Sequence, residues 1–476
     1  MLITGPNTFQ RQFITWYRLI KESLSGKEQV YTSGSIRRAV VLLAVPMMLE
    51  MSLESVFAVV DIYFVNELGP NAVSVVGLTE AVMALIYSVA VGLSAAATAV
   101  VSRRMGEQDA PGARSSAAHS LVLALVVSMA LGFLGYLGSE WLLQMMGTEP
   151  QSIQEGLSYT RIMLGSCGVV VFIFLINGIF RGAGNATIAM HSLWLANGIN
   201  IVLCPVLIKG LGPFPELGIA GAAWATVIGR GSGVLYQVYH LYFAKRAWFK
   251  QYPHSGNYAY QTFKSLLNIG TPATLQFLVQ SASWIVLAAL VAQHGSEASA
   301  GYQTAIRLFL FFLLPAWGIS NAAATLVGQN LGARESQRAQ DSVSVIVKYN
   351  TYFMAVVTLL FFVLAKPLLQ AFIGIQHPTE MHYATQALYI ICSGYVLYGL
   401  GMVYMQAFNG AGDTKTPTYI SLFGFWLFQI PFAFVLSRVL KLGPLGVFIA
   451  IPVAEGIMAF LYWWYFKKGN WKLNKV

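Results

Sequence analysis

Residues 38–69 read RAVVLLAVPMMLEMSLESVFAVVDIYFVNELG, a run in which apolar side chains far outnumber polar ones. About 20 residues of α-helix, at about 1.5 Å each, cross the ~30 Å hydrocarbon core of a bilayer. The run is longer than that and starts at two arginines, Arg37 and Arg38. We therefore predict that it forms an uncleaved first transmembrane helix.

The rest of the chain has the same character. Of its 476 residues, 56% are hydrophobic and 10% are charged. So few charges cannot cover the surface of a water-soluble protein of this size, which excludes a soluble multidomain enzyme. The net charge of +10 fits lysines and arginines that flank membrane spans, and we do not expect nucleic-acid binding.

Apolar runs between charged or Gly/Pro breaks predict twelve spans, which start near residues 38, 72, 117, 157, 187, 216, 263, 299, 343, 383, 416 and 445. Of the 29 lysines and arginines, 22 lie in the terminal segments and in every second connection, and four lie in the opposite connections. Positive residues accumulate on the cytoplasmic side of membrane proteins. We therefore predict a multi-pass protein of the inner or plasma membrane with both termini in the cytoplasm.

The two halves of the chain repeat at an offset of about 226 residues. Pro46 falls on Pro272, Gly92 on Gly318 and Gly106 on Gly332, while Gly218 and Gly221 fall on Gly443 and Gly446 at an offset of 225. Because six spans return the chain to its starting side, the halves should be related by an axis along the membrane normal. We predict an all-α integral membrane protein with 12 transmembrane helices, in two six-helix bundles related by this pseudo-two-fold axis.

The repeat also predicts the domain boundaries. They are a cytoplasmic segment with an interfacial helix or a tail at 1–36, an N-lobe at 37–244, a linker at 245–262, a C-lobe at 263–468 and a cytoplasmic tail at 469–476. Two bundles with a cavity at their interface are typical of alternating-access transporters.

Acidic residues deep in a span are costly, so each one indicates a function or a specific partner. The first span carries Glu54 and Asp61, seven residues apart and therefore on one helix face. Desolvation favours the protonated carboxyl, which a proton-coupled carrier requires. The alternative is that neighbouring amides and hydroxyls satisfy the two acids in a structural role.

Uncharged polar residues in the fourth to sixth spans are candidate partners for these acids, either as ligands of a small cation or as hydrogen-bond donors. Bonding between helices without any ion is the alternative. The matching second-half positions carry no acid, since Asp61 falls on Leu287, Glu54 on Gln280 and Asn200 on Trp426. The candidate partners are Asn177, Asn197, Asn200, Cys204 and Thr226.

Other polar residues carry less weight at this stage. Glu455 lies in the last span, and Arg230 and Arg307 are expected nearer span ends, where their side chains reach the headgroups. The abundance of Met and aromatic residues suits an adaptable apolar cavity. Candidates for its lining are Met51, Gln276, Gln280 and Tyr398.

Motifs for nucleotide, zinc or serine-nucleophile chemistry are missing from the sequence. The three cysteines lie far apart in apolar stretches. We therefore expect no enzymatic activity and no cofactor.

Four motifs resemble the multidrug and toxic compound extrusion family, in its prokaryotic branch with ion coupling in the N-lobe. The resemblance covers residues 36 to 468 and implies V-shaped lobes that export organic, often cationic compounds in exchange for protons or sodium ions. The motifs are Pro46 with Glu54-Ser-x5-Asp61, Arg181-Gly-x-Gly-Asn185-Ala-Thr187, Asn200-Ile-Val-Leu-Cys204-Pro205 and Gly410-x-Gly-Asp413-x-Lys415-x-Pro417.

The resemblance implies that Asp61 is the coupling acid, with Asn177, Asn200 and Thr226 in support. Two departures stand out, since the family pattern usually has Asp where Cys204 stands and commonly Gln where Glu54 stands. We hypothesise that Glu54 replaces the missing charge. A sodium site in the C-lobe, known in another branch, would need acids near Gln280 and Tyr398, and the sequence predicts none there.

The resulting prediction is an ion-coupled antiporter for amphipathic cations, acting as a monomer in the lipid bilayer. Protons are the expected coupling ion, and Na⁺ held by Asp61, Asn200 and Thr226 is the alternative. The alternative function is a flippase or exporter of a lipid-linked or other amphipathic precursor, although such proteins tend to line the cavity with cationic side chains for phosphate. A membrane-embedded transferase or a sensor would need a catalytic cluster or a soluble domain, and neither is indicated.

Overall fold

The computed structural model describes residues 8–26, 29–244, 247–251, 259–373 and 377–474. Side chains are described for all of these residues except 8–15, 58–63, 66, 70, 251, 259 and 371–373. Within the described ranges the protein is helical and contains no β-strand.

The first half of the chain forms one bundle, preceded by α1 (Thr8–Ser23). Its helices are α2 (Ile36–Asn66), α3 (Pro70–Gly106), α4 (Ala110–Met145), α5 (Pro150–Gly165), α6 (Gly168–Gly182), α7 (Ala186–Lys209) and α8 (Ile219–Val238), which the π-helical turn η1 (Tyr239–Phe243) continues. The predicted linker at 245–262 holds the short α9 (Trp248–Gln251), and residues 245–246 and 252–258 of it lie outside the described ranges.

The second half forms the other bundle. Its helices are α10 (Ala259–Ala292), α11 (Ser296–Gly332), α12 (Ser336–Ile373), α13 (Pro378–Ser393), α14 (Tyr395–Gly410), α15 (Lys415–Ser421), η3 (Leu422–Gln429), α16 (Ile430–Phe434), η4 (Val435–Val439) and α17 (Pro444–Lys468), followed by η5 (Asn470–Leu473).

Ten helical segments among the described residues are long and apolar enough to cross a membrane, and the bent pair α13–α14, with an angle of 50° at the break, makes an eleventh. The remaining predicted span is α8, in which four glycines and Arg230 lower the hydropathy. The twelve predicted starts therefore all correspond to helices, and the predicted all-helical membrane fold is confirmed.

Local sequence signals set the helix boundaries. The Ser35 hydroxyl caps α2 by accepting a hydrogen bond from the Arg38 amide, and the Asp109 carboxylate caps α4 by accepting one from the Gly112 amide at 3.0 Å. Gly69 lies at φ +94° just before Pro70, the first residue of α3. These signals set where α2, α3 and α4 begin.

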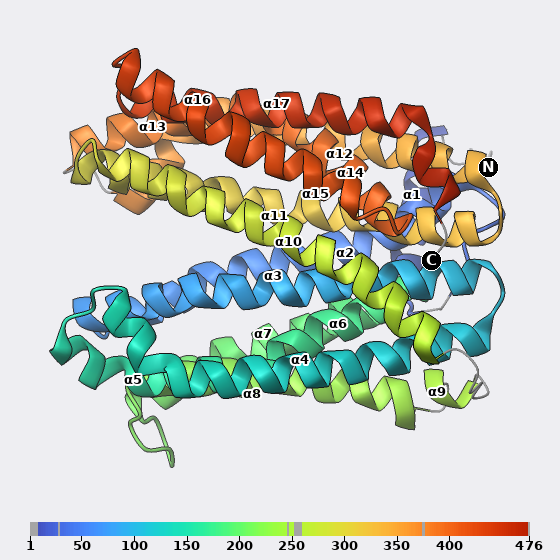
Figure 1. Ribbon diagram of the computed structural model, residues 1–476, viewed down its shortest axis with the longest axis horizontal. Helices are drawn as coiled ribbons and strands as arrows, with labels where there is room; N and C mark the ends of the chain where they lie inside the picture. Colours follow the sequence, from blue (N-terminus) through green and yellow to red (C-terminus); the bar gives the residue numbers. More distant parts are fainter. Residues whose placement is uncertain (1–7, 27–28, 245–246, 252–258, 374–376, 475–476) are drawn as a thin grey trace, which may run out of the picture.

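Two helices pass from one lobe to the other (Figure 1). The first part of α2, from Ala39 to Met47, packs in one apolar core with α11, α12 and α14 of the C-lobe. Leu266 and Ile269 of α10 in turn pack in the core of the N-lobe. Each crossing helix carries a proline near the crossing, Pro46 in α2 and Pro272 in α10. Since proline removes a backbone hydrogen bond, α2 and α10 have a point of bending there.

Glycines bring the lobes into backbone contact, and they do so symmetrically. A Cβ added at Gly92 would lie 2.6 Å from the Thr274 amide nitrogen, and one at Gly318 would lie 2.2 Å from the Met47 carbonyl oxygen. Near the end of the molecule that carries α1 and η5, an added Cβ at Gly106 would meet the Gln329 carbonyl. The repeat-related Gly332 meets the Arg103 carbonyl. Contacts that recur at the repeat offset agree with the predicted pseudo-two-fold axis.

Gly92→Ala should destabilise the protein by about 1–3 kcal/mol, because the new methyl group forces α3 and α10 apart. Gly77→Ala in the same helix is the matched control, since nothing lies within 4 Å of a Cβ there. The measurement is thermal unfolding of the detergent-solubilised protein. Equal melting temperatures for the two variants would contradict the close approach of the lobes.

Candidate functional site

After Pro46, α2 carries two glutamates one turn apart, of which Glu50 is fully buried and Glu54 is 16% exposed. The Glu50 side chain is 0% exposed, forms an ion pair with Arg181 and accepts a hydrogen bond from Asn177 Nδ2 at 3.0 Å. Asn177 and Arg181 are themselves four residues apart on α6. A carboxylate at this depth therefore has both a positive charge and a donor from a single neighbouring helix.

Glu54 binds two other helices of the same lobe. Its Oε1 lies 2.7 Å from Arg230 Nη2 on α8, and its Oε2 accepts a hydrogen bond from Asn197 Nδ2 on α7 at 3.0 Å. The Arg230 side chain is 4% exposed, and its guanidinium also lies 5.6 Å from the ring centre of Phe57 and 5.7 Å from that of Tyr87. The expectation that Arg230 reaches the headgroups is wrong, because Glu54 and two aromatic rings hold it inside the lobe.

Asn177 extends this network to the other helices of the N-lobe. Its amide oxygen accepts hydrogen bonds from Ser192 Oγ on α7, at 3.1 Å, and from Gln237 Nε2 on α8. Gln237 also donates to Ser192 Oγ at 2.9 Å. One amide group thus connects the Glu50–Arg181 pair to α7 and α8.

Asn200 and Thr226 form a separate pair, with the Asn200 amide donating to Thr226 Oγ1 at 3.0 Å. Asn200 lies about one turn beyond Asn197 on α7, and Thr226 lies about one turn from Arg230 on α8. In both cases the shift is away from the end of the molecule that carries α1. That is the direction in which α2 continues from Glu54 to Asp61. The Asp61 side chain lies outside the described residues, and Cys204 is fully buried in α7.

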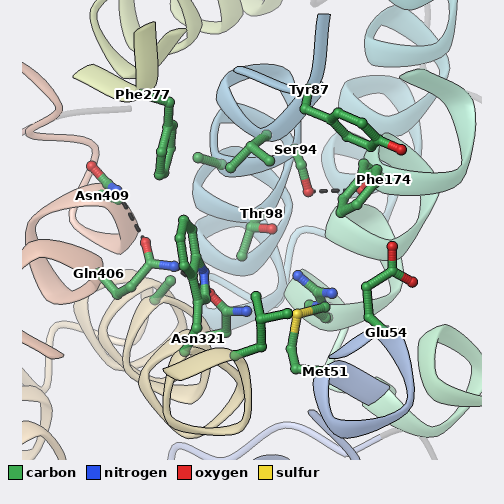
Figure 2. Close-up of a pocket in the computed structure, with 16 residues that line it drawn as sticks. Met51, Glu54, Tyr87, Ser94, Thr98, Phe174, Phe277, Asn321, Gln406 and Asn409 are labelled. Atoms are coloured by element: carbon green, nitrogen blue, oxygen red, sulfur yellow. Dashed lines mark hydrogen bonds between the residues drawn. The ribbon is translucent and has the colours of Figure 1, made fainter. Parts of the chain in front are cut away.

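A cavity of about 240 Å³ separates the lobes next to this network. Figure 2 shows Glu54, Met51, Tyr87 and Phe174 on one side of it and Phe277, Gln406 and Asn409 on the other. The lining from the N-lobe is Met51, Glu54, Tyr87, Val91, Ser94, Ala95, Thr98, Phe174 and Arg181, and the lining from the C-lobe is Phe277, Leu314, Trp317, Asn321, Ala324, Gln406 and Asn409. The cavity therefore offers aromatic rings, amides, one carboxylate and one guanidinium.

Amide groups form a connected row on the C-lobe side of the cavity. The Trp317 indole N–H donates to Asn321 Oδ1 at 3.0 Å, and Gln406 donates to the same oxygen. Asn409 Nδ2 in turn donates to Gln406 Oε1 at 3.0 Å. This row orients uncharged polar groups toward a ligand without adding charge to the C-lobe wall.

The other predicted lining residues lie elsewhere. Met51 lines the cavity, whereas Gln276, Gln280 and Tyr398 are not part of its lining. Gln280 donates to the Tyr398 hydroxyl at 3.1 Å. Gln276 is fully buried, and within the described residues neither its amide oxygen nor its amide nitrogen has a hydrogen-bond partner.

An acid does lie beside Tyr398, contrary to the prediction from the sequence. Glu455 on α17 is buried and close enough to Tyr398 for an electrostatic interaction. At the offset of 225 that relates Gly218 to Gly443, Glu455 corresponds to Arg230. The C-lobe therefore has a carboxyl group where the N-lobe has a guanidinium, and no ion pair joins Glu455 to a cation in the described part of the chain.

A two-lobed helical membrane protein with a mixed aromatic and polar cavity between its lobes belongs to the class of transporters. The MatE family model matches residues 46–206 and 272–435, which is most of both lobes. The chain belongs to this family, and the resemblance seen in the sequence motifs is confirmed.

Curated relatives agree with this assignment. The chain is 28% identical over 453 residues to the probable multidrug resistance protein YoeA of Bacillus subtilis, covering 94% of this chain and 97% of the relative. It is 27% identical over 463 residues to the probable multidrug resistance protein NorM of Thermotoga maritima, covering 97% of each. A relative in Shewanella oneidensis, 25% identical over 90% of this chain and 93% of its own length, is named an FAD transporter. These relatives are transporters, as predicted here, and not enzymes.

Solved structures of this family have the same fold. A MATE structure in complex with MaL6 is 26% identical and superposes with a TM-score of 0.86, covering 93% of this chain and 98% of the other. The same identity, coverage and TM-score hold for a MOP superfamily transporter from Pyrococcus furiosus, described as having a binding pocket of reverse polarity.

Arg230→Gln should destabilise the protein by up to about 3 kcal/mol, the lower end for a buried pair, because it leaves the mostly buried Glu54 carboxylate without its cation. The double variant Glu54→Gln/Arg230→Gln should recover most of this loss, since amides can replace the ion pair without an unpaired charge. Thermal unfolding of Arg230→Gln, Glu54→Gln, the double variant and the wild type gives the coupling between the two residues.

Glu455→Gln is the matched contrast at the repeat-related position. It removes a buried acid that has no cation, so stability should stay within about 1 kcal/mol of the wild type. A loss at Glu455 as large as that at Arg230 would contradict the assigned difference between the lobes.

Proposed function

We propose that this protein is an ion-coupled secondary antiporter that exports amphipathic organic cations by alternating access of the cavity between its lobes. The observation that carries the proposal is the double role of Glu54. Its carboxylate lines the cavity and also belongs to the buried N-lobe network through Arg230 and Asn197. Because the Glu54 carboxylate faces the cavity and also bonds Arg230 and Asn197, a cation bound in the cavity changes the electrostatics of these residues. A change in their charge in turn alters the affinity for the cation.

The lining chemistry supports cationic, aromatic substrates. Tyr87, Phe174, Phe277 and Trp317 present ring faces or edges to the cavity, and rings attract both cations and other flat apolar groups. A substrate ammonium near Glu54 competes with Arg230 for the carboxylate. Such a substrate is bound more tightly when the network carries its negative charge.

Coupling is proposed to run through Asp61, with Glu54 as the second acid. The coupling ion, H⁺ or in the alternative Na⁺, reaches Asp61 from outside. Asn200 and Thr226, which are hydrogen-bonded to each other on α7 and α8, are the proposed supporting residues. Neutralising the acids on α2 weakens the attraction for a cation in the cavity and favours its release. The substrate and the coupling ion then compete through different affinities for two conformations.

We further propose that the protein acts as a monomer in the plasma membrane, with the end that carries α1 and η5 in the cytoplasm. The distribution of lysines and arginines supports this orientation. The close glycine contacts between α3 and α11 then lie on the cytoplasmic side. In the conformation described, the lobes are therefore in backbone contact on that side.

Asp61→Asn should abolish substrate export driven by an ion gradient, while the variant still inserts and purifies normally. Glu54→Gln should reduce coupled export almost as much, because it also removes the partner of Arg230. The measurement is efflux of an organic cation such as ethidium from proteoliposomes, with imposed pH or Na⁺ gradients and with ionophores that collapse each one.

Glu67→Gln is the control, since Glu67 follows α2 at the surface, where it pairs with Lys209. It should transport at the wild-type rate. Wild-type exchange by Asp61→Asn would refute the assigned coupling acid, and transport unchanged by both ionophores would refute ion coupling altogether.

A second candidate substrate class follows from Arg181, whose guanidinium also lines the cavity. Arginine forms strong paired hydrogen bonds with phosphate. This favours an amphipathic phosphate-bearing compound, the chemistry of a lipid-linked precursor and of the compound in the name of the Shewanella relative. The two classes differ in which charged residue they require.

Arg181→Gln should impair export of a phosphate-bearing compound such as FAD more than export of ethidium if this second class is correct. Counterflow of each compound in proteoliposomes measures the difference. Transport of ethidium alone, by the wild type and by Arg181→Gln, would contradict the phosphate-bearing class.

A further inference from the structure

The chain between α1 and α2 crosses the seam between the lobes at the end that carries α1 and η5. We call its described residues, 23–26 and 29–35, the strap. On the N-lobe side the strap lies against residues 183–187, which are the turn between α6 and α7 and the first two residues of α7, and which we call the loop at 183–187. The hydrogen bonds on this side are Thr187 Oγ1 to the Ser23 carbonyl at 2.9 Å, Asn185 Nδ2 to the Gly26 carbonyl at 3.2 Å, and the Tyr31 hydroxyl to the Gly184 carbonyl at 3.3 Å.

On the C-lobe side the strap binds two side chains. The Tyr31 amide donates to Gln329 Oε1 on α11 at 2.9 Å. The Arg338 guanidinium on α12 donates to the carbonyls of Tyr31 at 3.3 Å, Ser33 at 2.8 Å and Gly34 at 2.9 Å. Hydrogen bonds from a charged donor are roughly twice as strong as neutral ones. The strap is therefore held more firmly on the C-lobe than on the N-lobe.

The last two residues of α6, just before this loop, also contact α11 directly. Thr325 Oγ1 donates to the Arg181 carbonyl and Gln329 Nε2 to the Gly182 carbonyl, each at 3.1 Å. Gly184 has φ +85°, and a Cβ there would lie 2.0 Å from the Gln29 carbonyl of the strap. The strap thus covers a place where the two lobes touch. Residues of the motif from Arg181 to Thr187 form the surface that it contacts on the N-lobe.

Burial raises the pKa of the Tyr31 hydroxyl above its ordinary value, so the group stays protonated and donates to Gly184. The C-terminal segment makes a second crossing with fewer hydrogen bonds. Arg103 donates to the Asn474 carbonyl, and Lys472 Nζ lies 2.7 Å from Gln340 Oε1. Among the described residues the strap makes more of the bonds that bridge the seam at this end.

We propose that the strap is a latch that holds the lobes together at this end, and that it leaves the loop at 183–187, while staying on Arg338 and Gln329, whenever this end opens. The inference rests on the proposed alternation of access. It assigns Asn185, Thr187 and Arg338 as positioning residues that set how often the cavity becomes accessible from this side.

The test uses a cysteine placed at Ser102, which is fully buried where α3 meets Gly328 of α11. The native cysteines are buried too and give the background. The rate of maleimide labelling is measured on Ser102→Cys protein in lipid nanodiscs, without substrate. Added Arg338→Gln, or Tyr31→Phe with Thr187→Val, should each raise the rate about tenfold, since each weakens one attachment of the latch.

Arg334→Gln is the matched control, because Arg334 is an exposed arginine at the same end of the molecule. It should label at the parent rate. Equal labelling of all variants, with unchanged melting temperatures, would overturn the latch. If Arg338→Gln lowers the melting temperature, the double variant decides, since it removes two hydroxyls and no charge.

The labelling and export experiments can overturn the latch and the proposed function independently of each other. Faster labelling in the two latch variants, together with no gradient-driven export by the wild type, would support the latch and overturn the antiporter. Normal export by the wild type with equal labelling in every variant would leave the antiporter in place and overturn the latch.

Discussion

Charge neutralisation along α2 is the constraint on which the rest of the N-lobe depends. Glu50 is fully buried and Glu54 is mostly buried at the cavity, so an unpaired carboxylate at either position is costly. Arg181 and Arg230 neutralise them from α6 and α8, which fixes the second half of α2 to the N-lobe. The first half of the same helix belongs to the core of the C-lobe, across Pro46. Any event that changes the charge on α2 therefore acts on a helix that both lobes share.

The lobes share a scaffold and differ in chemistry. Glycine contacts and crossing prolines recur at the repeat offset, so the packing of one lobe reproduces that of the other. The charges do not recur. Gln276 and Gln280 stand at the positions that match Glu50 and Glu54, and Glu455 stands at the position that matches Arg230. This difference places the buried ion pairs of the described residues in the N-lobe and leaves Glu455, a buried acid of the C-lobe, without one.

Much of this organisation could be predicted from the sequence. Hydropathy and the repeat were sufficient for the spans and the symmetry, because both depend on local composition. Asn197, a predicted partner of the acids on α2, bonds Glu54, whereas Asn177 bonds Glu50 instead. The partners are less accessible to such reasoning, since a sequence shows which residues share a helix face but not which face meets which.

The predictions that were wrong or missing have the same cause, which is that the sequence does not show which helix faces meet. The sequence places Arg230 near a span end, where arginines usually reach the headgroups, and nothing in it shows that α8 turns this residue toward Glu54. The 225-residue offset pairs Glu455 with Arg230, but the sequence does not show that Tyr398 lies beside Glu455. Glu50 lies four residues before Glu54, a spacing that indicates a second acid on the same helix face.

The most direct test of the account is calorimetry of substrate binding to the purified protein in buffers with different ionisation enthalpies, repeated with and without Na⁺. If a bound cation competes with the coupling ion for the acids of α2, binding should release protons or weaken as Na⁺ increases. Binding heats and affinities that depend on neither the buffer nor Na⁺ would contradict the coupling of the cavity to the buried charges.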